Sequence, residues 1–385
     1  MVSYPYEWCF SMLRDAALLQ LDLLLAALDE NMTLKDATPF NVQWFGTRPV
    51  FIDTGSFTRA DPGTPWLGYR QFCEMFLYPL LLQAYKGVPF QPWLRGSLEG
   101  LDAGHVNRLM SLRDRLRPGV FTHVYLLSKA QSRYSETSRD VRQELRSAGF
   151  GPALVKANVT RMRRTVERLR WNAGRSTWSE YADTNSYDPE NRDRKLRFVR
   201  EAARSQRRAV VWDLGCNTGE YSRAVRESAD LVVALDADHL AIERLYRALA
   251  QENDTTILPL VADLTNPSPG VGWRNLERRT LLDRTRPDLI LALALIHHLA
   301  IARNVPLPEI VDWLASFGSE VVVEFPGPGD PMVQRLLRNR GDLDFGYTRA
   351  RFEAELERHF STVAVDQLLS GQRTIYHLRP RAIAG

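Results

Sequence analysis

The sequence is poor in cysteine, in lysine and in long apolar runs. Its three cysteines, Cys9, Cys73 and Cys216, lie far apart, which excludes the close pairs of a zinc site and the framework of a small disulfide-rich secreted protein. The longest apolar stretch, 289–296, is far shorter than the ~20 residues that cross a bilayer. The start, MVSYPYEW, has no basic flank followed by an apolar run. We therefore expect a cytoplasmic protein with no membrane partner and no metal.

The basic residues are almost all arginine. Lysine and arginine together number 50 against 46 acidic residues, which gives a net charge of +4, and only five of the 50 are lysine. Arginine is densest over 161–208, where Glu167 and Trp171 interrupt the run. This mixture is more typical of a solvated helix face than of a phosphate-binding surface, so nucleic acid is an alternative partner and not the favoured one.

The first part of the chain is predicted to be mainly helical. With 385 residues, of which 44% are hydrophobic, the chain suits one large or two ordinary domains. Apolar residues recur at helical spacing over 9–31, and short strand-like runs at 41–45 and 49–52 flank a turn. From 69 to about 155 the pattern is helical again, with breaks expected at Pro79, Pro89, Pro92 and Pro118. We expect a mainly α amino-terminal domain over 1–155.

A polar but aromatic stretch separates this part from the rest. Residues 172–193 carry Trp178, Tyr181 and Tyr187, and a plain linker would have fewer large rings. We expect a helical connector over 156–205 whose aromatic rings form a lid over a ligand. An aromatic cluster between two domains is an equally good interpretation.

The second domain, over 206–385, alternates strands and helices. A charged helix at 190–206 leads into runs that are apolar on both faces, which predict strands at 209–213, 231–236, 256–261, 288–295 and 320–325. Such strands favour a parallel sheet covered by helices on both sides. The last two runs, 361–368 and 373–378, flank a Ser-Gly-Gln turn and predict an antiparallel hairpin that closes the sheet.

The ends of the first three strands predict a nucleoside site. In an open α/β sheet, ligands bind at the carboxyl ends of the strands. There Gly215 and Gly219 allow close approach of a ligand, Asp236 can accept hydrogen bonds from ribose hydroxyls, and Asp263 lies beside an apolar neighbour that suits an adenine. We expect the ligand to contact Asp213, Gly215, Asn217, Gly219, Tyr221, Asp236, Ala262, Asp263 and Leu264, with Trp178 and Tyr181 as the lid.

The acids at this edge favour one nucleoside ligand over another. A dinucleotide site reads G-x-G-x-x-G, whereas D-L-G-C-N-T-G at 213–219 lacks the middle glycine and places Asp213 at the turn. A carboxylate repels a pyrophosphate but attracts the ammonium and sulfonium of S-adenosylmethionine. The edge therefore favours S-adenosylmethionine as cofactor.

These motifs, with L-D-A-D at 235–238, A-D-L at 262–264 and the final hairpin, resemble those of class I S-adenosylmethionine-dependent methyltransferases over about 205–380. The resemblance implies a Rossmann-like seven-stranded sheet and methyl transfer. More narrowly, Y-P-Y-E-W at 4–8, N-P-S-P-G at 266–270 and A-L-A-L-I-H-H-L at 292–299 resemble the nodulation-related group, which carries an extra amino-terminal region. The structural alternative is an α/β domain with a degenerate, empty pocket.

Three side chains are candidates for catalysis. His297 and His298 follow the fourth strand, where an imidazole could take a proton from a hydroxyl or amine. The alternative is that one histidine contacts the cofactor or caps a helix while the other packs. Glu324 ends the fifth strand and could orient a histidine or bind the acceptor, and plain structural pairing is as good an interpretation.

A second motif lies in the amino-terminal region. Asp36, Asn41 and Asp53 are spaced similarly to the catalytic loop and metal-binding aspartate of the kinase and aminoglycoside phosphotransferase fold. The resemblance implies a base at Asp36 and magnesium ligands at the other two. No histidine precedes Asp36 in the expected place, and no glycine-rich loop or strand lysine lies upstream. We therefore expect a non-catalytic, kinase-lobe-like region that shapes or recruits the acceptor, with an active kinase as the lesser alternative.

The sequence thus predicts a methyltransferase that uses S-adenosylmethionine and acts at O or N of a small-molecule or glycan-like acceptor. One alternative is a non-catalytic module that binds the cofactor and recruits a partner. Another is a methyltransferase for RNA or protein, which the arginine run would support.

Overall fold

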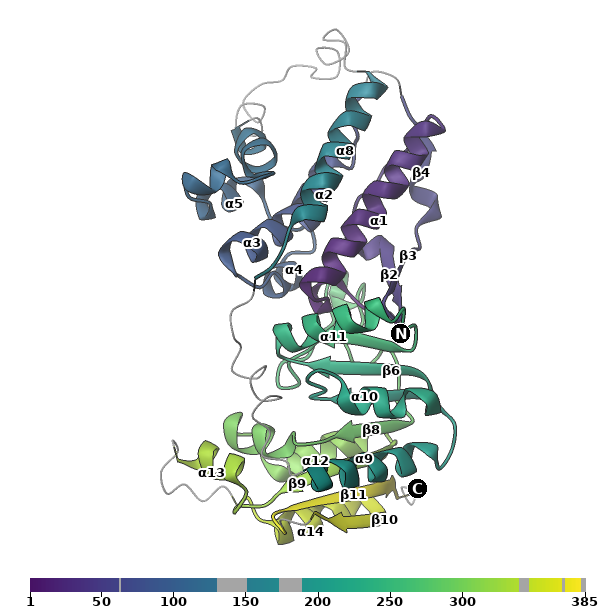
Figure 1. The fold of residues 1–385 in the computed structure, drawn as a ribbon, viewed down its shortest axis with the longest axis vertical. Helices are drawn as coiled ribbons and strands as arrows, with labels where there is room; N and C mark the ends of the chain where they lie inside the picture. The colour runs from purple at the N-terminus through teal and green to yellow at the C-terminus, as the bar shows by residue number, and fades with distance from the viewer. Residues whose placement is uncertain (62–63, 130–150, 173–188, 339–345, 369–370, 382–385) are drawn as a thin grey trace. The chain divides into compact units, whose positions relative to one another are not determined.

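The computed structural model describes residues 1–61, 64–129, 151–172, 189–338, 346–368 and 371–381. The chain divides into two compact units, the first of residues 2–174 and the second of residues 175–385 with Met1. Figure 1 shows the elements of both. Two helices overlap the interval 156–205 that was predicted as a connector. Of these, α8 (Pro152–Arg168) belongs to the first unit and α9 (Pro189–Arg204) to the second.

The first unit is built on a long helix and two small two-stranded sheets. The apolar face of α1 (Phe10–Asp29) is buried and packs against α8. The strands pair antiparallel, β1 (Met32–Leu34) with β4 (Phe57–Arg59) and β2 (Val42–Phe45) with β3 (Arg48–Phe51). The predicted helix over 9–31 and the predicted hairpin are confirmed. The other elements are η1 (Pro5–Glu7), η2 (Pro39–Asn41), η3 (Thr54–Ser56), α2 (Tyr69–Phe72), η4 (Cys73–Leu77), α3 (Tyr78–Lys86), α4 (Gln91–Gly96), α5 (Ala103–Leu109), η5 (Arg113–Leu116) and η6 (Val120–Tyr125).

The predicted break at Pro79 is wrong. Elements α2, η4 and α3 follow one another without a gap, and Pro79 is the second residue of α3. Proline has no N–H to donate and clashes with the carbonyl four residues earlier in an α-helix. The turn before it, η4, is a π-helix. Because a π turn pairs residues five apart, the helical segment continues past the proline.

The second unit contains one seven-stranded sheet with the order β10-β11-β9-β8-β5-β6-β7. Strands β5 to β9 are parallel, and β11 runs antiparallel to both β9 and β10. The predicted Rossmann-like sheet with a closing antiparallel hairpin is therefore confirmed. The strands are β5 (Arg208–Leu214), β6 (Ala229–Asp236), β7 (Ile257–Val261), β8 (Leu289–Ala292), β9 (Glu320–Pro326), β10 (Phe360–Gln367) and β11 (Arg373–Pro380).

The sheet places a ligand site where its strand order reverses. From β5 the chain adds β6 and β7 on one side and then β8 and β9 on the other, so the carboxyl ends of β5 and β8 flank a switch point. Helices and short turns connect the strands: α10 (Glu220–Val225), η7 (Arg226–Ser228), α11 (His239–Gln251), η8 (Trp273–Asn275), η9 (His298–Ala302), α12 (Leu307–Ser316), α13 (Pro331–Leu337) and α14 (Arg349–His359).

The fourth strand is shorter than its apolar run predicts. The prediction covered 288–295, but β8 ends at Ala292. Ala294 has a φ of +50°, which lies outside the extended region. Its backbone N–H donates to Oε2 of Glu324 at 2.8 Å instead of to a neighbouring strand. The apolar residues after Ala292 therefore form a turn beside the ligand site.

Candidate functional site

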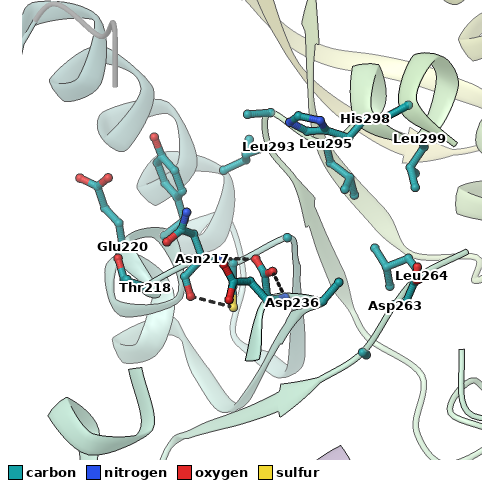
Figure 2. A pocket seen from close by; sticks show the side chains of 18 of the residues that line it. Asn217, Thr218, Glu220, Asp236, Asp263, Leu264, Leu293, Leu295, His298 and Leu299 are labelled. Atoms are coloured by element: carbon teal, nitrogen blue, oxygen red, sulfur yellow. Dashed lines mark hydrogen bonds between the residues drawn. The ribbon is translucent and has the colours of Figure 1, made fainter. Parts of the chain in front are cut away.

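A cavity of about 530 Å³ lies at the carboxyl ends of β5 to β8. Of the residues predicted from the sequence, it brings together Gly215, Asn217, Tyr221, Asp236, Ala262, Asp263, Leu264 and His298. Figure 2 shows Asp236 between Asn217 and Asp263, with His298, Leu295 and Leu299 across the cavity. Sequence reasoning missed the other lining residues, Arg192, Lys195, Cys216, Thr218, Glu220, Ala237, Asp238, Thr265, Leu293, Ala294, Leu295, Leu299, Ala302 and Arg303.

The glycine-containing turn after β5 forms one wall and is bound to β6. The N–H groups of Gly215 and Cys216 donate to the carbonyl of Leu235 at 2.8 and 3.0 Å. Gly219 has a φ of +81°, and a Cβ there would lie 2.5 Å from Leu245 Cδ1. A larger residue at position 219 would therefore be strained and would displace Leu245 of α11. Gly219 does not line the cavity, and its predicted contact with a ligand stays a prediction.

Asp213 also lies behind the cavity wall. It is 1% exposed, it is not a lining residue, and its Oδ2 accepts a hydrogen bond from Ser222 Oγ at 2.5 Å. Burial raises the pKa of Asp213 to about 6. Asp213 therefore supports the turn from behind the cavity wall, and its predicted contact with a ligand stays a prediction.

Asp236 presents a carboxylate without a cationic partner. Its Oδ2 accepts the N–H of Asn217 and its Oδ1 accepts that of Asp238, both at 2.8 Å, and within the described ranges no salt bridge involves it. Each oxygen has two lone pairs and can accept a second hydrogen bond from the cavity. Burial raises the pKa of Asp236. A buried carboxylate of this kind favours hydroxyl donors or a cation beside it.

Asp263 and Leu264 form the neighbouring edge. Oδ1 of Asp263 accepts the N–H and the hydroxyl of Thr265 at 2.9 and 2.7 Å. Its Oδ2 accepts Nη2 of Arg303, another lining residue, at 3.3 Å. The side chain is thus fixed as an acceptor next to an apolar wall, which is the pairing that the sequence predicted for an adenine.

Two basic residues of α9 line the cavity, and neither was predicted. Arg192 forms an ion pair with Glu220. Lys195 is 1% exposed, and its Nζ donates to Glu324 Oε2 at 2.5 Å and lies 4.7 Å from the ring centroid of Tyr221. A sequence signal did exist, because Lys195 lies four residues before the buried Val199, on the apolar face of its helix.

Glu324 is buried and surrounded by donors. Its Oε2 accepts from Lys195 Nζ and from the N–H of Ala294, and its Oε1 accepts Nη1 of Arg373 at 3.2 Å. Arg373 in turn binds Asp330 through Nε at 2.6 Å. Glu324 does not line the cavity. Its geometry suits positioning of the turn after β8, while the predicted contact with an acceptor stays a prediction.

The two histidines occupy different environments. His298 lines the cavity beside an apolar wall, whereas His297 is fully buried behind it, with 4.0 Å between the ring centroids. Burial, with a contribution from Arg373, lowers the pKa of His298 to about 4. Burial also lowers the pKa of His297 well below its usual value. Neither ring nitrogen of His297 has a hydrogen-bond partner among the described residues.

The remaining predicted residues lie elsewhere. Trp178 and Tyr181 fall outside the described residues. In the first unit Asn41 Nδ2 donates to Asp53 Oδ2 at 3.0 Å, and Asp36 is held through its backbone by Ser56 and Gln20. No cluster of three or more side chains that could bind a metal occurs in the described part of the chain. The kinase-lobe interpretation stays a prediction.

Comparisons with known proteins give one close relative and several distant structures. No family model matches the chain. It is 36% identical over 378 residues to the nodulation protein NoeA of Rhizobium meliloti (strain 1021), and the match covers 97% of this chain and 79% of that protein. Among solved structures it is similar to the N-methyltransferase NodS of Bradyrhizobium japonicum WM9, with 13% identity, a TM-score of 0.38 and coverage of 51% of this chain and 99% of that one. A SAM-dependent methyltransferase of Aquifex aeolicus gives 14% identity, a TM-score of 0.36 and coverage of 54% and 100%.

Proposed function

This chain belongs to the family of the nodulation protein NoeA, and we propose that it is an S-adenosylmethionine-dependent methyltransferase that serves nodulation. Its acceptor is a small molecule or a glycan-like molecule, methylated at O or N. The observation that carries the proposal is the carboxylate of Asp236, which faces the cavity at the carboxyl end of β6 and has no cationic partner in the described part of the chain.

The cavity residues fit the chemical groups of this cofactor. Asp236 can accept both vicinal hydroxyls of a ribose, because each of its oxygens keeps a lone pair beside the bond from the backbone. Asp263 and Leu264 provide an acceptor and an apolar surface for an adenine. The acidic edge attracts a sulfonium and repels a pyrophosphate. Of the basic groups in the cavity, Arg192 and Lys195 are paired with Glu220 and Glu324. Arg303 is paired with Asp263, so the attraction for a sulfonium rests mainly on Asp236.

The chain's own residues then align the acceptor and exclude water. The cofactor would supply a methyl group bound to a positively charged sulfur. An in-line nucleophile can bond to that methyl carbon as the carbon–sulfur bond breaks and the sulfur leaves as a neutral thioether. Alignment of the reacting groups can supply roughly 7–11 kcal/mol of the barrier. The wall formed by Leu293, Leu295 and Leu299 keeps this part of the cavity apolar. His298 lines the cavity and can accept the proton that a hydroxyl or amine acceptor loses. Its lowered pKa keeps it unprotonated and also makes it a weaker proton acceptor than an ordinary imidazole.

Calorimetry with S-adenosylhomocysteine tests the cofactor assignment. We expect the wild-type chain to bind, and Asp236→Asn to weaken binding about 10- to 100-fold, because hydrogen bonds to a charged group contribute about 1.5–3 kcal/mol. Asp288→Asn is the matched control, since Asp288 accepts the N–H groups of Ala209 and Val210 at 2.6 and 2.9 Å but does not line the cavity. Equal effects of the two substitutions would contradict the assignment.

Turnover separates an enzyme from a protein that only binds the cofactor. We expect S-adenosylhomocysteine to be released when the chain and S-adenosylmethionine are incubated with a metabolite extract, and one extract component to gain the mass of a methyl group. Binding without release over several extracts would favour the non-catalytic interpretation.

A further inference from the structure

The segment from α5 to just beyond η6 exposes a group of large apolar side chains. These are Leu109 (46% exposed), Leu112 (74%), Leu116 (90%), Phe121 (49%) and Leu126 (45%), which we call the Leu116 surface. Single exposed leucines are ordinary on protein surfaces, whereas several in one place mark a contact site. The segment lies in the first unit (Figure 1), and the candidate cofactor site uses none of these residues.

Local packing joins apolar and cationic groups on this segment. Both α5 and η5 pack against η6. Phe121 stacks on Tyr125 with 5.6 Å between the ring centroids. The guanidinium carbon of Arg115 lies 4.1 Å from the centroid of the same Tyr125 ring, and Lys129 Nζ lies 5.1 Å from it. An exposed phenylalanine, a half-buried tyrosine and two cations therefore lie on the same segment as the leucines.

The exposed charges of the segment are mainly positive. Residues 108–129 contain one acidic residue, Asp114, and five basic ones, Arg108, Arg113, Arg115, Arg117 and Lys129. Asp114 is 4% exposed and forms ion pairs with Lys86 and Arg117. Arg108 and Arg113 are both exposed. The surface that this segment offers to a partner is thus apolar and positively charged.

We propose that the Leu116 surface binds peripherally to a bilayer that contains anionic lipids. Leucine and phenylalanine side chains enter the boundary between headgroups and acyl chains, while arginine and lysine attract anionic headgroups. Among the described residues no helix is long and apolar enough to span a membrane, and a surface contact needs none. The expectation of no membrane partner rested on the lack of a spanning segment. The mostly aliphatic exposed groups favour lipid over RNA, which is bound by stacking on aromatic rings.

Vesicle flotation of the full chain tests this surface. We expect binding to vesicles of phosphatidylcholine with 40% phosphatidylglycerol, at least tenfold weaker binding to phosphatidylcholine alone, and weaker binding as salt rises. The variant Leu112→Ser/Leu116→Ser should lose at least tenfold in affinity for the anionic vesicles, and Arg108→Gln/Arg113→Gln should lose most of the preference for them. The control Leu67→Ser/Leu276→Ser removes leucines that are 63% and 69% exposed elsewhere and should stay within twofold of wild type.

Other occupants of the surface give different results. If the chain itself covers these leucines, Leu112→Ser/Leu116→Ser lowers the melting temperature by several degrees and wild-type vesicle binding is absent, which overturns the proposal. If a second copy covers them, the double variant converts a dimer to a monomer in sedimentation, which also overturns it. If Leu112→Ser/Leu116→Ser floats with anionic vesicles as well as the control Leu67→Ser/Leu276→Ser does, the proposal is also overturned. None of these measurements involves methyl transfer, so failure here leaves the proposed function untouched.

Discussion

His298 allows a test of catalysis at the scale of one residue. Because burial lowers its pKa to about 4, the imidazole is neutral, and able to accept a proton, at every pH well above that value. A base with the ordinary pKa near 6.5 would lose about tenfold of its neutral form between pH 8 and pH 5.5. We therefore expect turnover, measured as release of S-adenosylhomocysteine, to stay nearly constant over this range. His298→Ala should lower turnover at least tenfold and leave cofactor affinity almost unchanged.

The control for this substitution is another partly buried histidine. Burial also lowers the pKa of His239, which begins α11 and does not line the cavity. His239→Ala should keep turnover within about twofold of wild type. Full turnover in the double variant His297→Ala/His298→Ala would end the hypothesis of an imidazole base. A rate that falls through pH 6.5 would show that a group with an ordinary pKa limits the reaction.

At the scale of elements, the sequence predicted strands and missed what holds their ends. Runs that are apolar on both faces predicted five parallel strands, because two-sided burial in a sheet leaves that pattern. The same pattern extended the fourth strand too far. The apolar run continues through the turn to Ile296, and the first polar residue, His297, comes only after it. The turn itself depends on Glu324, which is 30 residues from Ala294. A contact between distant segments produces no periodic pattern of apolar residues in either segment, so a search for such patterns does not detect it.

The basic residues of α9 were missed for a related reason. Lys195 and Glu324 are 129 residues apart in the sequence, so nothing near either residue indicates the pair. The arginine-rich composition around Lys195 favoured a solvated face, which holds for Arg197 and Arg200, both exposed. The acids at the ends of β6 and β7 were predicted because the parallel topology alone brings strand ends together.

The Lys195–Glu324 pair gives a stability test at the same scale, because it joins α9 to β9. Both side chains are at most 1% exposed, and with Arg373 and Asp330 they form a charge-balanced set. Lys195→Met or Glu324→Gln leaves one buried charge without compensation, which should cost about 3–5 kcal/mol of unfolding free energy. The double variant Lys195→Met/Glu324→Gln removes one charge of each sign and leaves Arg373 paired with Asp330. Its loss of unfolding free energy should therefore be clearly smaller than the sum of the two single losses. Urea unfolding followed by circular dichroism measures all three.

An exposed pair that joins the last residue of α9 to η7 is the control for this cycle. Arg204 and Glu227 are 3.8 Å apart and 66% and 79% exposed. Removing either charge of such a pair changes the free energy of unfolding by about 0–1 kcal/mol. The effects of the two single substitutions should add in the double variant. Additive losses in the Lys195–Glu324 cycle would mean that the two charges are solvated independently of each other.

At the scale of the whole molecule, the chain separates its candidate functions. Every residue that lines the cavity lies between Arg192 and Arg303, in the second unit. The Leu116 surface lies in the first unit, as do Asp36, Asn41 and Asp53. The sequence predicted a boundary near residue 206, where helical spacing gives way to alternating strands and helices, whereas the two units divide between residues 174 and 175. It offered no comparable signal for the Leu116 surface, because exposure depends on how neighbouring turns pack.

This separation predicts how a fragment behaves. A fragment of residues 175–385 keeps the whole sheet and all cavity residues. We expect it to bind S-adenosylhomocysteine within about threefold of the full chain, since ligand affinity depends on contacts that the fragment retains. Asp236→Asn should weaken binding by the same factor in both. The fragment should not float with anionic vesicles, because it lacks the Leu116 surface. A folded fragment, shown by a cooperative melt, that fails to bind the ligand would mean that the first unit completes the site.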